Sequence, residues 1–411
     1  MRHGGLGVRG FHTGVGIVVV LTGCVLCTVP AIAQAKTTFD PAVAVEEGYD
    51  DNVFYTATNA MSDSVTRLNL DLPLHRESRT GTLDVRYRPS LWRYADFSEL
   101  DRDEHDLRVD WGAQPDPRTR LRLITGYRKT QEQGNAASVE TNDLFLGRRA
   151  DRDRIEMAFD LQREQNPRWN WGFNVSGSDT NYTLVLDPSV DPSTIRPPED
   201  KLEYGADLRF SRNVSRTTRI GGTYGHREFD PQRSGRESAD RVAMTWERDL
   251  ADRLTVGLAI GAYHSSQDAS SVNPASSRSG VSFELHLTRL YETTRLTVSA
   301  NHLPSSGGVL QGTATTSVVG VTWANLNRRY WNWRLSPRWT RRDPSDPTDF
   351  KRQTVGLSAS VERVLGKRFG VRLRGRAINQ SDDEPGVPDR SNAEAYLAFV
   401  WYPLGGTALG G

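Results

Sequence analysis

The chain has 411 residues, of which 52 are lysine or arginine and 51 are aspartate or glutamate, so its formal net charge is +1. This balance gives no support to a nucleic-acid partner, because nucleic-acid-binding proteins concentrate positive charge. The mean hydropathy of −0.58 would suit a soluble protein, but such an average cannot exclude a β-barrel, in which every second residue faces water or polar side chains.

The N-terminal segment has the layout of a secretory signal peptide. Arg2 and Arg9 form a basic start, an uncharged apolar run extends from 11 to 32, and Ala33-Gln34-Ala35 provides small residues for cleavage. We therefore expect residues 1–35 to be a cleaved signal peptide.

Both cysteines of the chain, Cys24 and Cys27, lie inside this segment. The mature chain therefore has no cysteine for a disulfide or a metal site. Leu21-Thr22-Gly23-Cys24 also resembles a lipoprotein signal, but the apolar run continues to Val29, where a mature lipoprotein should become polar.

Beyond the signal, apolar and polar residues alternate with period two from about residue 43 onward, and no comparable helical stretch occurs. Each alternating stripe spans about 9 to 12 residues, the length that a tilted strand needs to cross a membrane. The polar face of most stripes is charged, so it needs an interior that tolerates charge, such as a water-filled lumen. Within the stripes, the clearest alternation lies in 65–76, 82–94, 107–111, 155–161, 204–210, 254–260, 281–287, 331–339 and 355–361.

The connections between stripes alternate strictly between short and long, provided that the weak stripe at 144–149 is absorbed into the long connection 129–153. We therefore predict an all-β fold for residues 36–411: a single transmembrane antiparallel β-barrel of about 18 strands (roughly 16–20). The short connections would be periplasmic turns and the long ones extracellular loops, with the protein in the outer membrane of a Gram-negative-type bacterium. The short links are 76–81, 114–118, 164–168, 212–216, 249–252, 289–294, 326–330 and 363–368.

Tryptophans also sort by strand end, as expected of aromatic rings at membrane interfaces. Most fall beside the short turns: Trp111, Trp169, Trp171, Trp246, Trp323, Trp331, Trp333 and Trp401. We expect a second aromatic girdle at the opposite rim, formed by Trp92, Trp339, Tyr94, Tyr127 and Tyr263.

Strand phase also predicts which side chains face the lumen. Basic residues of the mature chain are overwhelmingly arginine, whose planar guanidinium makes two-point contacts with anionic oxygens. The lumen-facing candidates are Arg86, Arg88, Arg108, Arg120, Arg122, Arg209, Arg219, Arg334, Arg338, Arg372, Arg374 and Arg376.

Two interpretations of these arginines remain open. They can pair with inward acids and stiffen the barrel wall. Alternatively, basic stripes can guide an anionic solute or polymer; the stripe residues would be Arg120, Arg122, Arg372, Arg374 and Arg376.

We predict no catalytic, cofactor or metal site, and hence no enzyme. His264-Ser265-Ser266 and the pair His226 and Glu228 lie at outer positions, but neither forms a recognisable nucleophile motif. Phosphate-loop, zinc and dinucleotide patterns are absent from the sequence. The acidic run 99–104 could hold divalent cations at the lipopolysaccharide surface, although solvated loop acids are the better explanation.

The segment Glu47-Gly48-Tyr49-Asp50-Asp51-Asn52-Val53-Phe54 resembles the opening strand of outer-membrane β-barrel (porin-like) proteins associated with exopolysaccharide export loci. This resemblance implies an outer-membrane exit for, or accessory to, exopolysaccharide secretion, with periplasmic polysaccharide-export components as partners. The alternatives are a general or anion-preferring porin for small solutes and a non-conducting structural barrel. Outer-membrane lipid and lipopolysaccharide are further expected partners. The barrel-assembly machinery is another, since the aromatic-rich strand 393–402 resembles an assembly signal.

Overall fold

The computed structural model describes residues 36–404, apart from 55, 57, 133–149, 185–199, 232–234, 252, 270–274, 306–313, 326–330, 345–349 and 384–387. The expected signal peptide and the stripe at 144–149 lie outside the described residues. The only helix in the described part of the chain is the short 3-10 helix η1 (Ser98–Leu100). No described helix is long and apolar enough to cross a membrane.

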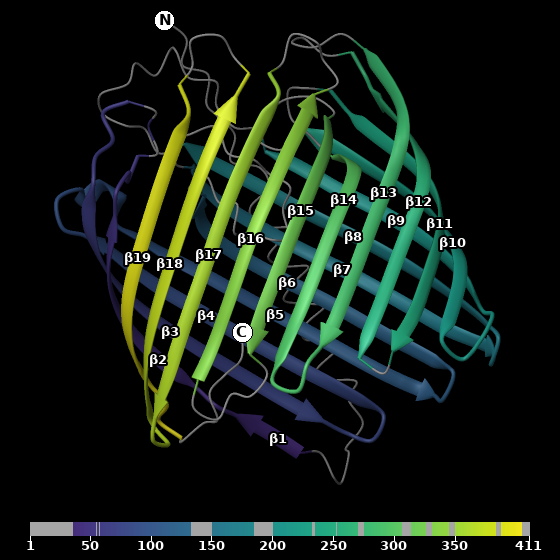
Figure 1. Ribbon diagram of the computed structural model, residues 1–411, viewed down its shortest axis with the longest axis horizontal. Helices are drawn as coiled ribbons and strands as arrows, with labels where there is room; N and C mark the ends of the chain where they lie inside the picture. The colour runs from purple at the N-terminus through teal and green to yellow at the C-terminus, as the bar shows by residue number, and fades with distance from the viewer. Residues whose placement is uncertain are drawn as a thin grey trace, which may run out of the picture.

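The strands follow one another in chain order (Figure 1). Their bounds are β1 (Lys36–Phe39), β2 (Ala42–Asp50), β3 (Asp63–Glu77), β4 (Gly81–Tyr94), β5 (Arg102–Asp116), β6 (Thr119–Glu132), β7 (Ala150–Asn166), β8 (Trp169–Leu184), β9 (Lys201–Asn213), β10 (Thr218–Pro231), β11 (Glu237–Ala251), β12 (Leu254–Gln267), β13 (Ser276–Leu290), β14 (Thr294–Ser305), β15 (Ala314–Asn325), β16 (Trp331–Pro344), β17 (Arg352–Leu365), β18 (Phe369–Asp382) and β19 (Arg390–Trp401).

The sheet closes on itself. Each strand from β2 to β19 pairs antiparallel with the next, and β19 returns to pair with β2, from Trp401 opposite Val43 to Glu394 opposite Asp50. We call this β2–β19 pairing the seam. The prediction of a closed antiparallel barrel is confirmed.

The short strand β1 adds no position to the wall. It pairs with residues 74–77 of β3, while β2 pairs with residues 63–71 of the same strand. β1 and β2 are therefore two parts of one wall position, interrupted at Asp40-Pro41, where proline has no N–H to donate. Of the 19 strands, those from β2 to β19 form the closed wall, which has eighteen positions as predicted.

Short and long connections fall where the alternation placed them. Turns such as 78–80 and 117–118 close one end of the barrel, which we call the turn end, and connections such as 95–101 lie at the other, the loop end. The strands are longer than the apolar stripes, reaching 17 residues in β7. The extra residues are polar ones that continue the pairing beyond the apolar part of the strand.

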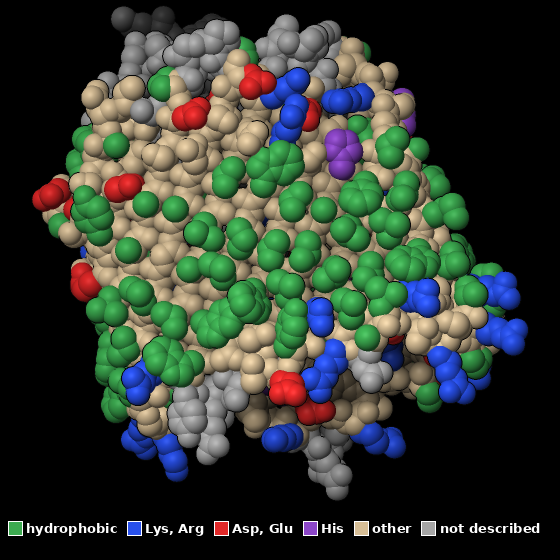
Figure 2. Space-filling model, in the orientation of Figure 1, with side chains coloured by type: hydrophobic (Ala, Val, Ile, Leu, Met, Phe, Trp, Pro, Cys, Tyr) green, Lys and Arg blue, Asp and Glu red, His purple; other side chains and the backbone are tan. Residues whose placement is uncertain are grey.

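One face of the sheet is apolar and exposed. In β19 the residues alternate strictly, with Glu394 and Tyr396 buried at 8% and 3% exposure and Leu397 and Phe399 exposed at 56% and 52%. The buried face is the interior of the barrel, and the exposed face carries a hydrophobic band across the middle of the side seen in Figure 2. A closed barrel with such a band spans a membrane without unpaired backbone groups. The protein is therefore an outer-membrane β-barrel.

Two small apolar clusters lie inside the barrel. Near the turn end, Ala42, Ala44, Ala398, Val400 and Tyr402 line the seam. At the loop end a larger cluster joins the connections 51–62 and 95–101 to the wall; it contains Val53, Phe54, Val65, Trp92, Tyr94, Leu100 and Tyr396. We call this second cluster the cap.

The cap corrects the predicted aromatic girdle at the loop end. Trp92, Tyr94 and Tyr263 are only 7%, 6% and 4% exposed, and they face the interior instead of the membrane. Trp92 and Tyr94 share the strand phase of Arg86 and Arg88, so the alternation already assigned them to the inner face. The prediction that they lie at the membrane interface is wrong for these rings, because strand phase turns them inward.

Candidate functional site: the charged inner wall

The inner face of the barrel carries the charged side chains that the alternation assigned to the lumen. Directly opposed residues of antiparallel strands share a face, so the strand registers place each arginine. Arg334, for example, lies opposite Ser360 on β17, which lies opposite Arg374 on β18. The registers place all of the following on the inner face: Arg86, Arg88, Arg108, Arg120, Arg122, Arg209, Arg219, Arg334, Arg338, Arg372, Arg374 and Arg376.

At the seam, one buried carboxylate serves two arginines. Glu46 on β2 is 2% exposed and accepts a hydrogen bond from Arg374 of β18 at 2.9 Å. Arg67 of β3 approaches it from the other side at 3.7 Å. The residue opposite Glu46 on β19 is Ala398, whose small side chain lets Arg374 cross β19. The carboxylate therefore braces strands on both sides of the seam.

The neighbouring arginines of β18 also have carboxylate partners. Arg372 donates through Nε to Glu362 of β17 at 2.9 Å, and the hydroxyl of Tyr402 donates to the other oxygen of that carboxylate. Arg376 lies 3.7 Å from Glu394 of β19. Each of these three β18 guanidiniums is thus matched with an acid on an adjacent or next-adjacent strand.

A second set of ion pairs lines β3 to β6. Arg86 makes a two-point contact with Asp71, with its Nε at 2.7 Å. Arg88 donates to Asp106 at 2.6 Å. Arg122 contacts Asp110 through two nitrogens, with Nε at 2.8 Å.

Other inward arginines are held loosely or not at all. Arg209 lies 3.9 Å from Asp160 and Arg219 lies 3.6 Å from Glu247, and both arginine side chains are 50% exposed. Among the described residues, no carboxylate forms an ion pair with Arg120 or Arg338. Arg338 donates to Thr340 Oγ1 at 3.4 Å, a weak contact.

These contacts bear on both interpretations of the basic stripes. Of the stripe residues, Arg122, Arg372, Arg374 and Arg376 have carboxylate partners, whereas Arg120 is exposed and has none in the described part of the chain. Pairing therefore accounts for most of the stripe. It does not remove the guanidiniums from water, because Arg122 remains 54% exposed and Arg88 45% exposed.

Arginines also stack on aromatic rings beneath the cap. Trp92 lies between two guanidiniums, with Arg67 4.2 Å and Arg102 3.9 Å from its ring. Arg374 lies 4.8 Å from the ring of Tyr396, which meets Trp92 edge to face at 6.2 Å. The cap thus connects to the seam through alternating cations and rings, an arrangement that the sequence analysis missed.

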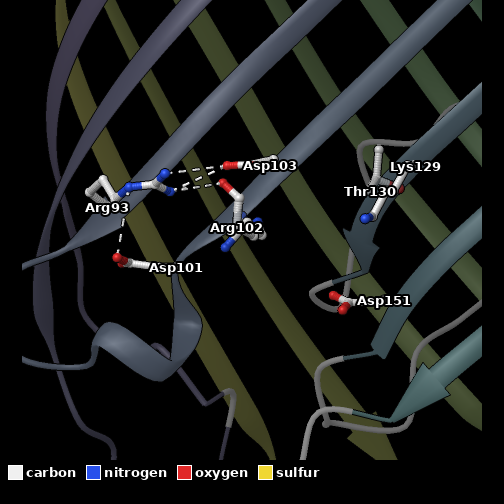
Figure 3. A pocket seen from close by; sticks show the side chains of 7 residues that line it. All are labelled: Arg93, Asp101, Arg102, Asp103, Lys129, Thr130 and Asp151. Carbon is white, nitrogen blue, oxygen red and sulfur yellow. Dashed lines mark hydrogen bonds and ion pairs between the residues drawn. The ribbon is translucent and has the colours of Figure 1, made fainter.

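A charged cavity opens at the loop end where two strands separate. β5 and β6 pair only as far as His105 and Lys129, and beyond that point Arg102 and Asp103 lie apart from Thr130. The cavity has a volume of about 460 Å³. Figure 3 shows Arg93 reaching Asp101 and Asp103 on one side, and Lys129 and Asp151 on the other. The cavity is therefore lined by charges of both signs, and Arg93 is paired with two of its carboxylates.

The histidines considered as catalytic candidates lie on the outward face at the loop end. His226 Nδ1 lies 2.9 Å from Asp240, and His264 Nδ1 lies 2.9 Å from Ser279 Oγ. No group of three or more possible metal-ligating side chains occurs among the described residues. Three acids of the run 99–104 pair with arginines instead: Asp101 and Asp103 contact Arg93, and Glu104 contacts Arg102 at 2.9 Å.

Comparisons with known proteins yield only distant similarities. No family model and no curated protein sequence matches the chain. Pseudomonas aeruginosa OccK2 (OpdF) is similar at 11% identity and a TM-score of 0.45, over 91% of this chain and 99% of that one. A BenF-like porin from Pseudomonas fluorescens Pf-5 is similar at 12% identity and a TM-score of 0.45, over 90% of this chain and 99% of that one.

The ferric citrate transporter FecA is similar at 12% identity and a TM-score of 0.44, over 89% of this chain. The chain spans 64% of the length of FecA. Similarity at this level carries no information about cargo.

Proposed function

We propose that the chain is an outer-membrane channel that admits small anionic solutes. Barrels of this strand number are wide enough to hold an aqueous channel. The observation that carries the proposal is the inner wall itself, where guanidiniums such as Arg88, Arg122 and Arg209 remain about half exposed beside their carboxylates. A pair exposed to water contributes only about 0–1 kcal/mol, so a passing anion can displace the carboxylate at little cost.

The wall also offers more donors than its acids can use. A guanidinium has five N–H groups, and a carboxylate engages two of them in a two-point contact. Arg120 and Arg338 add positive charge that no described carboxylate balances. This excess favours anions over neutral solutes, in agreement with the porin alternative.

The exopolysaccharide role rests on the resemblance of residues 47–54 alone. In the structure, residues of this segment hold the loop end of the seam together: Asn52 Nδ2 donates to the Ser391 carbonyl at 2.8 Å, and Asn392 Nδ2 donates to Asp50 at 2.6 Å. This bonding gives these polar residues a structural reason to be present that is independent of cargo. We therefore favour a porin function over the exopolysaccharide exit. Transport measurements have to identify which solutes pass.

The test is solute entry into vesicles that contain the refolded chain 36–411. Pyruvate serves as the anionic probe, glycerol as the neutral probe and dextran as the polysaccharide. We expect pyruvate to enter faster than its size predicts. The double variant Arg120→Gln, Arg338→Gln should lower the rate of pyruvate entry several-fold without changing the rate of glycerol entry.

The matched control is Arg341→Gln, because Arg341 faces outward and pairs with Asp343 at 3.1 Å. It should leave all rates unchanged. Equal entry of both small probes, scaled only by size, would contradict the anion preference. Passage of dextran would favour the exopolysaccharide exit.

A further inference from the structure

Several arginines lie on the outward face of the wall at the turn end. Each is opposed by an apolar residue of the membrane-facing side: Arg212 by Ile220, Arg248 by Val256, Arg289 by Leu296 and Arg363 by Val371. Their immediate neighbours in the chain, such as Glu247 and Glu362, face the interior. We call these residues the outward arginines; they are Arg212, Arg248, Arg289 and Arg363.

The outward arginines differ from most of the inward ones in having no carboxylate partner in the described part of the chain. None of them forms an ion pair with a carboxylate among the described residues, although all are exposed. At the loop end the situation is opposite, because outward-facing Arg93 lies 3.4 Å from Asp103 and Arg341 lies 3.1 Å from Asp343. No carboxylate of the described residues therefore supplies the counter-charge of these turn-end arginines.

Aromatic rings accompany three of the four outward arginines. Arg212 lies 5.4 Å from the ring of Trp169, Arg363 lies 5.3 Å from that of Trp331, and Arg289 lies 4.9 Å from that of Tyr291. Trp169 and Trp331 are 47% and 48% exposed, as expected of rings that contact lipid at the membrane interface. Figure 2 shows basic side chains along the lower margin of the hydrophobic band.

We propose that the outward arginines and their rings bind the headgroups of anionic phospholipid, such as phosphatidylglycerol, in the periplasmic leaflet. The guanidinium makes two-point contacts with phosphate oxygens, and the adjacent apolar rows contact the acyl chains. A soluble acidic protein fits less well, because the guanidiniums lie beside membrane-facing rings and not on the turns below them. Each basic residue near a negatively charged membrane surface contributes roughly a fivefold gain in affinity.

The experiment measures lipid retention by the refolded chain 36–411 in neutral detergent, using native mass spectrometry. Phosphatidylglycerol and phosphatidylcholine are supplied in equal amounts, and inorganic phosphate is tested as a competitor. We expect the wild-type chain to retain phosphatidylglycerol preferentially, by at least tenfold. The combined variant Arg212→Gln, Arg248→Gln, Arg289→Gln and Arg363→Gln should lose this preference, and Arg341→Gln should keep it.

Equal retention of the two lipids by the wild-type chain would overturn the proposal, and so would an unchanged preference in the combined variant. Displacement of phosphatidylglycerol by inorganic phosphate at similar concentration would show a phosphate site without a lipid requirement, which also contradicts it. If the combined variant does not fold, as judged by its shift on unheated gels, Arg212→Gln and Arg363→Gln are measured singly. Each should lower the preference several-fold, and no change in either would overturn the proposal.

Discussion

Arg374 on β18 donates to Glu46 on β2 at 2.9 Å, across β19 and across 328 positions of sequence. The same carboxylate faces Arg67 on β3, so the interaction braces four consecutive wall positions where the first and last strands meet. Backbone pairing closes the seam, and this side-chain brace fixes its register from the inside.

Replacing Glu46 with glutamine should destabilise the barrel. The change removes the negative charge that Arg67 and Arg374 share and leaves their two guanidiniums, 17% and 35% exposed, beside a neutral side chain. Breaking a fully buried ion pair from one side costs about 3–5 kcal/mol, and we expect a smaller loss here because water screens the partly exposed Arg374. Urea unfolding of the protein in vesicles measures the loss.

The control for this change is Glu47→Gln, one residue along. Glu47 faces outward, is exposed, and accepts a hydrogen bond from Thr66 Oγ1 at 3.0 Å. We expect a loss below about 1 kcal/mol. Similar losses for both variants would contradict the brace.

Gly48 should not tolerate a side chain. A Cβ at this position would overlap the ring of Tyr396 and lie 2.8 Å from the Ala395 carbonyl oxygen. Gly48→Ala therefore has to displace the ring from the cap, and we expect a loss of about 1–3 kcal/mol in the same unfolding experiment. Gly375→Ala provides the comparison, because its Cβ would make an ordinary contact at 3.8 Å with the Glu394 carbonyl. A harmless Gly48→Ala would show that Tyr396 is not held over this glycine.

Trp92 should stabilise the cap chiefly through its aromatic face. Trp92→Leu removes the ring from between Arg67 and Arg102 and the hydrogen bond from Nε1 to Ser90 Oγ at 3.2 Å. Desolvated cation–ring contacts contribute up to about 2 kcal/mol each. We expect Trp92→Leu to increase protease cleavage in 95–101, and Trp92→Phe to increase it less. Equal cleavage of the two variants would assign the effect to lost volume instead of the ring face.

Much of the architecture was predictable because alternation and connection length are local properties of the sequence. Strand order, turn positions and the face of each arginine follow from them. The interruption of the first wall position at Pro41 was missed, since β1 is only four residues long and precedes the stripes that were recognised. The interior position of Trp92 was not predicted, because tryptophan generally prefers membrane interfaces. Strand phase, which places Trp92 on the inner face, was the better guide.

The partners of the arginines could not be predicted from the sequence. Whether Arg374 meets Glu46 depends on the register of β19 against β2 and on the small size of Ala398. Alternation is unchanged by a two-residue slip, so it does not specify which acid faces which base. The exposure of Arg122 beside its acid likewise depends on the diameter and contents of the lumen.

Whether this barrel is a channel with a preference for anions can be read from the zero-current potential of the refolded chain 36–411. The protein is inserted into a planar bilayer that separates two potassium chloride solutions of tenfold different concentration. We expect stable open channels and a potential whose sign reports faster chloride movement, reduced in magnitude when Arg120 and Arg338 are replaced with glutamine. A closed barrel, or a potential that reports faster potassium movement, would contradict it.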